Sequence, residues 1–477
     1  MSRLSEPEPA GSPYRDRPTA VIAGSTSAFA DALASRLRGA GWVVQDGSAP
    51  RGDLDLVLWV ADEAAPDWDS AAGALRDALL LAGDVQPGLE RTAADARAAF
   101  VAVTRLDGIL GYSGVDLESA VTGGLPGLVK TLAAEAPAVF CRAIDLHPDL
   151  AEQRCVELVL AELSDVDSGL HQVGYDAEGV RRTVVRGSEP GADPELPACA
   201  PIAPPGPDDL LVVSGGGRGV TAECAIGLAR RFGTGLLLLG RTPLDADEPA
   251  WASGVPESQL KAAIAARLRE DGGKPTPRDV QPVYQKLVAQ REIRRTLSAV
   301  REAGAFVEYL TVDVADSDAV SAALAEHRDR ITGVVHGAGA LSDRLLVDKT
   351  AADVDAVFAP KLSGLRSLLR AVDQDRIRHV LLFSSVAGFF GNRGQADYAM
   401  ANESLNRLAC TLSRDLPAAN VASLNWGPWA GGMVTPELAR MFRDRGLEPI
   451  PVDTGVQIVV DHFAADHPEA VVSVVAS

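Results

Sequence analysis

Cysteine and histidine are scarce and scattered in this chain of 477 residues. There are five cysteines and seven histidines, and no cysteines are arranged as a Cys-x-x-Cys pair. A disulfide framework needs cysteines that can pair, and a zinc site needs clustered cysteine or histidine ligands. We therefore expect neither a disulfide-stabilised fold nor a metal site.

Long apolar runs and excess positive charge are also absent. No run approaches the roughly 18 residues needed to cross a bilayer. The polar, proline-bearing start lacks the apolar core of a signal peptide. We expect residues 1–18 to be disordered and the protein to be cytoplasmic. The net charge of −20 argues against nucleic acid or an anionic membrane surface as a partner.

The length of the chain predicts two or three domains, because one ordinary core does not accommodate so many residues. Its 47% hydrophobic and 23% charged residues are typical of a soluble globular protein. Residues 187–208 are rich in proline, glycine and acidic residues, as interdomain linkers are. The expected organisation is a first domain over 19–190, a linker over 191–208 and a second domain over 209–477.

The first domain alternates strand-like and helical patterns. Apolar runs at 20–23, 54–61, 100–104 and 140–145 alternate with helical spacing at 28–40, 71–82 and 123–134. This alternation indicates an α/β fold with a doubly wound parallel sheet. The loop after the first run, residues 24–27, lacks a glycine-rich phosphate cradle. We therefore expect a Rossmann-like domain without a dinucleotide site.

The second domain repeats the alternation, so the two halves form a cryptic repeat of one architecture. Its expected strands are 210–214, 235–240, 306–312, 331–336, 380–384 and 421–425, with 471–475 as an edge strand. The long connection over 242–304 contains helical spacing at 274–303. Because a bare loop of that length is uncommon in a compact domain, we predict an inserted helical hairpin at about residues 255–300, packed on the domain.

A glycine-rich loop follows the first strand of the second domain and opens a helix. Glycines allow the backbone to approach a pyrophosphate, which the helix N-terminus then stabilises. Such a loop alone could be an ordinary tight turn, but its position between a strand and a helix favours a nucleotide site. The residues expected to bind there are Gly215, Gly216, Gly217, Arg218, Gly219 and Val220.

The second strand of this domain indicates the coenzyme. NAD sites usually place an acidic residue at its end, whereas this chain has Arg241. Arg241 and Arg218 together suit a 2′-phosphate, which favours NADPH; the alternative is that both arginines are merely solvated. Asp313 could accept from the adenine amino group. The other expected cofactor contacts are Val314, His336, Gly337, Ala338, Gly339 and Pro428, with His336 itself structural rather than catalytic.

Residues 379–402 carry the candidate catalytic groups. An apolar run ends at Ser385, and a glycine- and asparagine-rich turn leads to an alanine-rich helical segment with Tyr398 and Asn402. Ligands of open parallel sheets bind at the carboxyl ends of the strands. The two hydroxyls could therefore face one carbonyl, with Asn402 one helical turn beyond Tyr398 on the same face. The alternative is a core strand with a serine-capped loop and a helix that uses Tyr398 for packing.

The combined motifs are specific. They read SGGGRGVTAE, LLLLGRTPL, VDVAD, HGAGAL, PKLSGL, FSSVAG, QADYAMANE and NWGPWAGGM. From about residue 19 onward the chain resembles the ketoreductase domain of polyketide synthases, a member of the short-chain dehydrogenase/reductase superfamily. The insertion and the stretch VKTLAAEAPAVFCRAIDL are most similar to iterative synthases of the polyunsaturated-fatty-acid or enediyne type. The resemblance implies a truncated, cofactor-free structural half and a catalytic half.

The resemblance also assigns roles to residues. Tyr398 is implied to be the proton donor, and Ser385 to hydrogen-bond the substrate carbonyl. Lys361 is implied to replace the lysine that simpler reductases carry four residues after the tyrosine, a position that Asn402 occupies here. From composition alone, Lys361 could equally be a surface lysine near a helix end.

The implied reaction is NADPH-dependent reduction of a β-ketoacyl thioester on the phosphopantetheine of an acyl carrier protein. Negative charge develops on the carbonyl oxygen during hydride attack, and preplaced donors from Ser385 and Tyr398 would stabilise it. An ammonium group on Lys361 would help Tyr398 release its proton. The chain has no LGxDSL-like attachment segment, so we expect the carrier and the other synthase domains elsewhere.

Two positions bear on the handedness of the product. Family members that form the D-hydroxyl carry Leu-Asp-Asp after the fourth strand, and this chain keeps the last aspartate as Asp343. Members of the opposite type carry tryptophan eight residues before the tyrosine, where this chain has Phe390. The resemblance thus implies a D-hydroxyl product, with Trp429 and Met433 bordering the substrate groove. The alternatives are a catalytically silent scaffold domain and a free-standing short-chain dehydrogenase.

Overall fold

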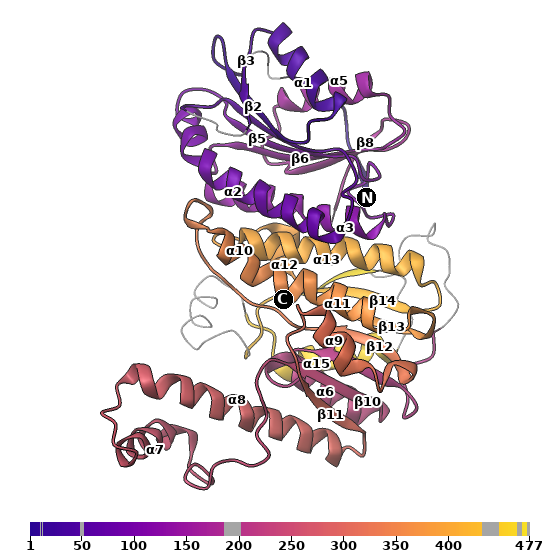
Figure 1. The fold of residues 1–477 in the computed structure, drawn as a ribbon. Coiled ribbons are helices and arrows are strands. Elements are labelled where there is room, and N and C mark those ends of the chain that lie inside the picture. The colour runs from indigo at the N-terminus through magenta and orange to yellow at the C-terminus, as the bar shows by residue number, and fades with distance from the viewer. Residues whose placement is uncertain are drawn as a thin grey trace.

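The computed structural model describes residues 1–9, 11, 13–47, 52–185, 202–431, 448–464 and 470–474. The chain forms two α/β units, one stacked on the other (Figure 1). Each unit is built on a mostly or wholly parallel sheet with helices on both faces. The doubly wound α/β architecture expected from the alternating pattern is therefore confirmed.

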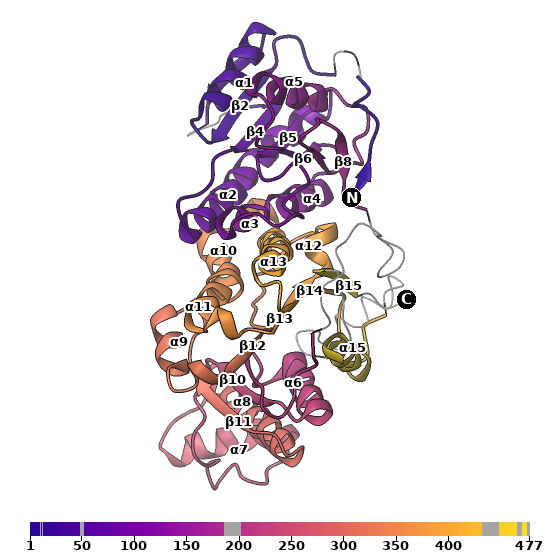
Figure 2. The same cartoon turned by 90° about the vertical axis from the view of Figure 1, so that its right-hand side faces the viewer.

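The first sheet contains eight strands in the order β1-β8-β7-β6-β5-β4-β2-β3. Its parallel strands are β2 (Thr19–Gly24), β3 (Val43–Asp46), β4 (Leu56–Ala61), β5 (Ala99–Thr104), β6 (Phe140–Leu146) and β7 (Gln172–Tyr175). The strands β8 (Arg181–Thr183) and β1 (Ser2–Arg3) extend it in antiparallel fashion. One face carries α1 (Ala28–Gly39) and α5 (Glu152–Leu163), and the other carries α2 (Trp68–Ala93), α3 (Leu117–Thr122) and α4 (Leu125–Glu135) (Figures 1 and 2).

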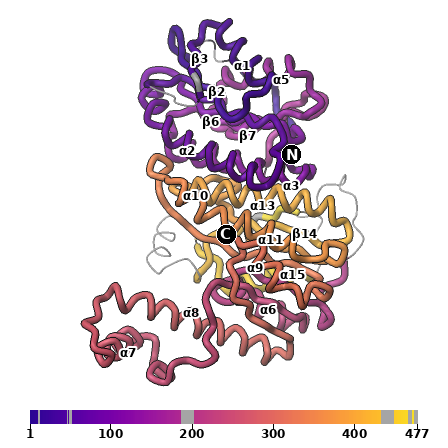
Figure 3. The backbone as a smooth tube through the Cα atoms, viewed as in Figure 1, coloured from indigo at the N-terminus to yellow at the C-terminus, as the bar shows by residue number. Residues whose placement is uncertain are grey.

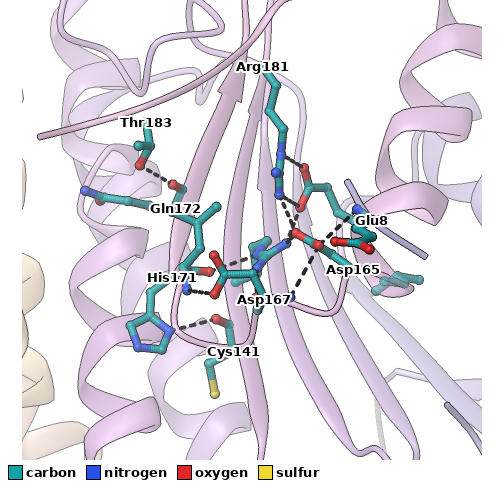
Figure 4. A network of polar contacts seen from close by, with 12 residues as sticks. Glu8, Cys141, Asp165, Asp167, His171, Gln172, Arg181 and Thr183 are labelled. Carbon is teal, nitrogen blue, oxygen red and sulfur yellow. Dashed lines mark hydrogen bonds and ion pairs between the residues drawn. The ribbon is translucent and has the colours of Figure 1, made fainter. Parts of the chain in front are cut away.

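The expectation that residues 1–18 are disordered is wrong for the described part of that segment. Ser2 and Arg3 pair with β8, the backbone N–H of Glu8 donates to Asp165 (3.2 Å, Figure 4), and the hydroxyl of Tyr14 donates to the carbonyl of Leu163 (3.0 Å). An edge strand is held mainly by its backbone hydrogen bonds, which a polar composition does not prevent.

The parallel part of the first sheet is smaller than the second sheet. Its order, β3-β2-β4-β5-β6-β7, matches β10-β9-β12-β13-β14-β15, so the described residues provide no counterpart of β11. Where the second unit has glycines before its first helix, the first unit has Ser27, whose Oγ accepts from the N–H of Ala30 (3.2 Å). The N-terminus of α1 is therefore capped by the chain itself.

The second sheet is entirely parallel, in the order β11-β10-β9-β12-β13-β14-β15. Its strands lie within one or two residues of the predicted ranges: β9 (Leu210–Ser214), β10 (Gly235–Gly240), β11 (Val307–Thr311), β12 (Ile331–His336), β13 (His379–Ser385), β14 (Asn420–Trp426) and β15 (Val471–Val474). Alternate residues along a strand pack into different apolar clusters, one on each face of the sheet. In β9, Leu211 and Val213 lie in one apolar cluster, whereas Leu210 and Val212 lie in the other.

Helices cover both faces of the second sheet. One face carries α6 (Gly219–Phe232), α15 (Val452–Ala464) and the C-terminal part of α8 (Pro277–Glu302). The other carries α9 (Ser317–Leu324), α10 (Ala351–Phe358), α11 (Gly364–Ala371) and α13 (Ala396–Asp415). Shorter elements connect them: α12 (Val386–Phe390), η1 (Arg328–Arg330), η2 (Leu346–Asp348), η4 (Gln374–Arg376) and a π-helical turn, η3 (Ala359–Ser363).

The predicted insertion contains two helices, α7 (Glu257–Glu270) and α8. Ile293, Leu297 and Val300 in the C-terminal half of α8 pack against the sheet and α6. The N-terminal half of α8 and α7 form a separate small core that includes Leu260 and Val280, and they project from the body of the molecule (Figure 1). The prediction that the whole hairpin packs on the domain is therefore wrong for its outer half.

The two units share one continuous core. Helices α2, α3 and α4 of the first unit lie against α10 and α13 of the second (Figures 2 and 3), and a single apolar cluster contains Leu128 and Leu132 as well as Met400 and Leu405. The contact is close, because a Cβ on Gly127 would lie 2.7 Å from the backbone of Ala399. The first unit thus forms part of the support for α13.

A buried ionic cluster reinforces this contact. Glu403 on α13 accepts from Lys130 on α4 (2.8 Å) and from Arg407 (3.0 Å), and all three side chains are at most 5% exposed. Removing one partner from such a cluster leaves uncompensated buried charge.

We expect Glu403→Gln to lower the free energy of unfolding by roughly 3–5 kcal/mol, because Lys130 and Arg407 then lack their carboxylate. Chemical denaturation followed by circular dichroism measures the effect. Glu326→Gln, at an exposed position of the same unit, is the matched control. Equal stabilities of the two variants would contradict the role assigned to the cluster.

None of the helices in the described part of the chain is both long and apolar enough to span a membrane. The cytoplasmic location expected from the sequence stays a prediction.

Candidate active site

The candidate catalytic side chains gather at the carboxyl edge of the second sheet. Ser385 is the last residue of β13, Tyr398 and Asn402 lie in the first two turns of α13, and Lys361 lies in η3. Parallel strands place the carboxyl ends of β9, β12, β13 and β14 along one edge. The topology therefore brings together residues that are far apart in the sequence.

Tyr398 is half-buried at this edge. Burial raises the pKa of its phenol, the side chains of Asn402 and Ser385 act in the opposite direction, and the charge of Asp343 raises the pKa further. The phenol is therefore protonated at neutral pH, as a proton donor must be. The alternative reading of Tyr398 as a packing residue does not account for this polar surrounding.

Ser385 ends β13 and is the N-cap of α12. Its Oγ accepts from the N–H of Ala387 (3.2 Å) and donates weakly to the carbonyl of Trp426 (3.4 Å). The residue is half-buried. A hydroxyl held by one long donor contact can turn to donate to a bound oxygen instead.

Lys361 is not the surface lysine that composition alone allowed. Its side chain is 3% exposed, its Nζ donates to the carbonyl of Phe383 (2.8 Å), and it lies 5.3 Å from the centroid of the Tyr398 ring. Burial lowers the pKa of the ammonium to about 7. Lys361 therefore lies beside the phenol and can both hold and release a proton near neutral pH.

The local backbone explains how Lys361 reaches this place. Helices α10 and α11 are joined by the π-helical turn η3, which contains Pro360. Proline has no N–H for the helical ladder, and π-helical turns frequently occur at functional sites. The turn is further held by His336, whose Nε2 pairs with the carbonyl of Lys361 (2.9 Å).

Asn402 is fully buried behind Tyr398. Its Nδ2 donates to the carbonyl of Tyr398 (2.7 Å), and its backbone carbonyl accepts from Ser384 (3.0 Å). Its Oδ1 has no hydrogen-bond partner among the described residues. A buried amide oxygen is normally paired, often with an ordered water, so Oδ1 fits the predicted water link in a proton relay.

The glycine-rich loop has the geometry of a phosphate cradle. Gly215 and Gly219 have φ of 72° and 68°, a region that favours glycine. A Cβ on Gly215 would lie 3.1 Å from the N–H nitrogen of Ala338, and one on Gly217 would lie 2.8 Å from Tyr309. Gly219 faces open space. The next helix, α6, has no side-chain cap at Arg218, so its N–H groups suit a bound phosphate.

The residues predicted to bind a 2′-phosphate lie at one end of the second sheet. Arg241 follows β10, is 72% exposed, and lies 4.0 Å from the carboxylate of Asp313. The charge of Arg218 acts on Tyr309, whose hydroxyl donates to the carbonyl of Thr242 (2.9 Å), so both guanidinium groups lie near this end of the sheet. One oxygen of Asp313 already accepts from the N–H of Ala315 (3.0 Å). The residues present therefore fit NADPH.

The HGAG stretch lies next to the glycine-rich loop and supports it. His336 is fully buried between Ser214 (2.8 Å) and the carbonyl of Lys361 (2.9 Å), and burial lowers its pKa to about 3. It is therefore a neutral structural residue. A Cβ on Gly337 would collide with Thr221, and one on Gly339 would lie 3.3 Å from Lys361. Val314 is also buried, against Gly364.

Two of the residues expected to contact the substrate, Asp343 and Phe390, are exposed. Asp343 is exposed and accepts from Gln395 (3.0 Å), and its charge reaches Tyr398. Phe390 is 54% exposed at the end of α12. Both lie where a substrate could contact them.

Trp429 does not border a substrate groove as predicted. It is 6% exposed, its ring packs against Trp426 with centroids 4.7 Å apart, and a Cβ on Gly455 would collide with it. Its apolar ring fills the core beneath α15. The carbonyl of Pro428 accepts from the N–H of Ile450 (2.7 Å). Met433 lies outside the described residues.

Several supporting residues have little or no signal in the sequence. Lys349 forms a buried ion pair with Asp397 (2.5 Å), which itself accepts from the N–H of Tyr398 (2.8 Å). In the sequence, only the position of Asp397 directly before Tyr398 points to this ion pair. Glu135 of the first unit bonds to two loops of the second, and nothing in its surroundings in the sequence indicates this. Among the described residues, no group of His, Cys, Asp or Glu is arranged to hold a metal ion.

The fold and the cluster around Tyr398 define an oxidoreductase of the short-chain dehydrogenase/reductase type, a class that uses nicotinamide cofactors. Residues 210–431 match the family model of the KR domain. The chain belongs to the ketoreductase domains found in polyketide synthases and related fatty acid synthases.

Two curated relatives illustrate this kinship. One, from Thraustochytrium, is a component of a polyunsaturated fatty acid synthase; it is 36% identical over 425 residues, which cover 85% of this chain and 14% of the relative. The other, from Mycobacterium tuberculosis, is a component of the phenolphthiocerol/phthiocerol polyketide synthase; it is 31% identical over 466 residues, covering 93% of this chain and 22% of the relative. The chain thus spans only a small part of these synthases.

Solved structures share the fold. An A-type ketoreductase from a modular polyketide synthase matches with a TM-score of 0.70 and 22% identity, covering 99% of this chain and 91% of that one. A ketoreductase domain from the bacillaene assembly line matches with a TM-score of 0.67 and 22% identity, covering 99% and 95%. The similarity includes the first unit as well as the second.

Proposed function

We propose that this domain catalyses the NADPH-dependent reduction of a β-ketoacyl thioester, carried by an acyl carrier protein, to the β-hydroxyacyl thioester. The observation that carries the proposal is the burial of Lys361 beside Tyr398, at the sheet edge that also bears Ser385. A buried lysine costs stability, and a catalytically silent scaffold would gain nothing from it. This argues for an enzyme over a scaffold domain.

The mechanism follows from the geometry of these residues. NADPH, which the glycine-rich loop and Arg241 would hold, would supply a hydride to the β-carbon of the substrate. Ser385 and Tyr398 donate to the carbonyl oxygen as negative charge develops there, which stabilises the transition state. Tyr398 then passes its proton to that oxygen, and the nearby Lys361 ammonium stabilises the phenolate that remains. Lys361 then gives a proton to the phenolate, and Asn402, through its unpaired Oδ1, holds a water that returns a proton to Lys361.

The carrier-bound substrate and the D-hydroxyl product belong to the same proposal. Two similar proteins are named as components of a polyunsaturated fatty acid synthase and a polyketide synthase, which supports a β-ketoacyl substrate and partner domains within a larger synthase. The exposed Asp343 beside Gln395 supports a substrate approach like that of D-hydroxyl-forming members.

The test offers the purified protein a β-ketoacyl N-acetylcysteamine thioester with NADPH or NADH. We expect loss of reduced-coenzyme absorbance with NADPH, much less with NADH, and a single enantiomer of the β-hydroxy thioester on chiral chromatography. Bound NADPH without turnover would favour the scaffold. Equally fast reduction of a simple ketone that lacks the thioester would favour a free-standing dehydrogenase.

Arg241 provides a test of the preference for NADPH over NADH. We expect Arg241→Ser to raise the KM for NADPH by about tenfold and to leave the KM for NADH nearly unchanged, because one charge-assisted contact at an exposed site is lost. Steady-state kinetics with both coenzymes measure the effect. Arg328→Ser, at an exposed arginine of η1, is the control. A parallel change for both coenzymes would contradict recognition of the 2′-phosphate by Arg241.

A further inference from the structure

Glu135 of the first unit contacts two loops near the active site. It is the last residue of α4 and only 8% exposed. One carboxylate oxygen accepts from the N–H of Gly394 and the other from the N–H of Leu346, each at 2.8 Å. The two partners lie 259 and 211 residues away in the sequence. A single buried side chain thus joins three separate segments.

The two loops are the ones that carry the residues next to the substrate position. Gly394 precedes Gln395 and the helix with Tyr398, and Leu346 follows Asp343 by three residues. The loops also touch each other. The N–H of Arg344 donates to the carbonyl of Gly394 (3.0 Å), and Gln395 donates to Asp343 (3.0 Å). Glu135 therefore bonds to both sides of the contact that sets Asp343 relative to Tyr398.

The end of α4 contacts this loop at further positions. The N–H of Asn392 donates to the hydroxyl of Thr131, one turn before Glu135 (3.3 Å). A Cβ on Gly391 would lie 2.6 Å from the backbone of Lys130, so the loop touches the helix directly. In Figure 2, α4 lies beside α12 and α13, the helices that this loop connects. The last turns of α4 thus hold the whole connection between α12 and α13.

Glu135 is well suited to fixing loop geometry. A carboxylate can accept two N–H groups at once, and hydrogen bonds to a charged acceptor contribute more than neutral ones. An apolar residue at this position would leave two buried N–H groups unpaired. Neither bond contributes to the glycine-rich loop or to Arg241, which lie on other strands. An effect on catalysis can therefore be separated from an effect on coenzyme binding.

We propose that Glu135 is a positioning residue: it fixes the distance between the Asp343 loop and the Tyr398 helix, and so sets both the rate and the handedness of the reduction. This inference rests on the proposed function. By this account the first unit supports the chemistry of the second without contacting substrate or coenzyme.

The test compares Glu135→Gln with the wild-type protein. An amide keeps the size of the side chain but presents an NH2 group to one of the two N–H donors. We expect kcat to fall by about tenfold, the dissociation constant for NADPH to stay within twofold, and the fraction of the minor enantiomer to rise several-fold. Glu152→Gln, at an exposed position of α5, is the matched control and should behave as wild type.

Two further measurements test the role of Glu135. If Glu135→Gln does not fold, Thr131→Val removes the neighbouring bond and should change the enantiomer ratio in the same direction, less strongly. Hydrogen exchange at 343–346 and 391–395 should quicken in Glu135→Gln whether or not the assay shows turnover. A wild-type protein that does not reduce the thioester would overturn the proposed function. Unchanged exchange, or a lower melting temperature with wild-type kcat and enantiomer ratio, would overturn the role of Glu135.

Discussion

Replacing Tyr398 by phenylalanine is expected to lower kcat for thioester reduction by about 10²–10⁴-fold, the usual contribution of a positioned general acid. The ring and its packing remain, but the proton donor and one of the two groups that stabilise the developing charge are lost. Binding of NADPH, measured by fluorescence titration, should be unchanged because the glycine-rich loop and Arg241 lie on other elements. Single-turnover kinetics then place the loss in the chemical step.

The matched control is Tyr284→Phe. Tyr284 lies in the outer part of α8 and donates to Glu257 (2.8 Å), far along the chain from the catalytic cluster. Its loss should leave kcat unaltered. Full activity of Tyr398→Phe would show that the proton comes from another group, and the mechanism given above would be wrong.

Lys361→Met is expected to abolish most of the activity while making the protein more stable. Without the ammonium, the phenolate of Tyr398 has no neighbouring positive charge, and we expect kcat to fall by roughly 10²-fold or more. In the wild-type protein, kcat for reduction should decline as the pH rises through about 7, the pKa to which burial lowers Lys361, because the deprotonated amine cannot supply a proton. The residual activity of the variant should lack this inflection.

The expected gain in stability follows from the same pKa. Burial lowers the pKa of Lys361 from 10.5 to about 7, so between these pH values the unfolded chain binds more protons than the folded one. The contribution of this group to stability therefore rises with pH across that window, and its full cost is present below pH 7. Methionine carries no such cost, so thermal unfolding should occur at a higher temperature in the variant, most clearly at pH 6. A lower melting temperature at pH 6 would contradict this account.

The second sheet could be predicted well because most of its strands are buried on both faces. Runs such as LLVVS and GLLLLG are continuously apolar, and each forms a strand at the expected place. The first sheet was harder to predict from the sequence. Its strands β7 and β8, near one edge, are short, and β8 is polar. They are stabilised by an ionic cluster in which Arg142 and Arg181 pair with Glu162 and Asp165; Figure 4 shows the pair of Arg181 and Asp165. That cluster joins separate segments and has no local pattern.

Helix α2 illustrates a second limit. The sequence pattern predicts a helix over 71–82, but the helix continues to Ala93, past Pro87. Proline removes one helical hydrogen bond and usually ends or kinks a helix. Here Val85 and Leu89 are buried in the core shared with the second unit, and this packing outweighs the local penalty. A prediction based on one segment does not contain that contribution.

The candidate site likewise contains residues that could be predicted from the sequence and residues that could not. Ser385, Tyr398 and Asn402 could be proposed from one stretch of sequence, because a strand, a loop and a helix follow one another there. Lys361 was indicated only by the resemblance, since its burial depends on a π-helical turn. Trp429 was misplaced because an apolar aromatic next to a loop reads equally well as a groove residue or a core residue. Glu135 acts across the contact between units, which a sequence pattern does not reveal.

The shared core also has a consequence for how the protein is made. Lys130 and its partner Glu403 are 273 residues apart, and synthesis at about 5–20 residues per second separates them by roughly 14–55 s. During that interval the apolar side of α4 emerges from the ribosome before α13 exists to cover it. We therefore expect the nascent chain to be shielded by a chaperone, or to stay only partly folded, until the later segment arrives.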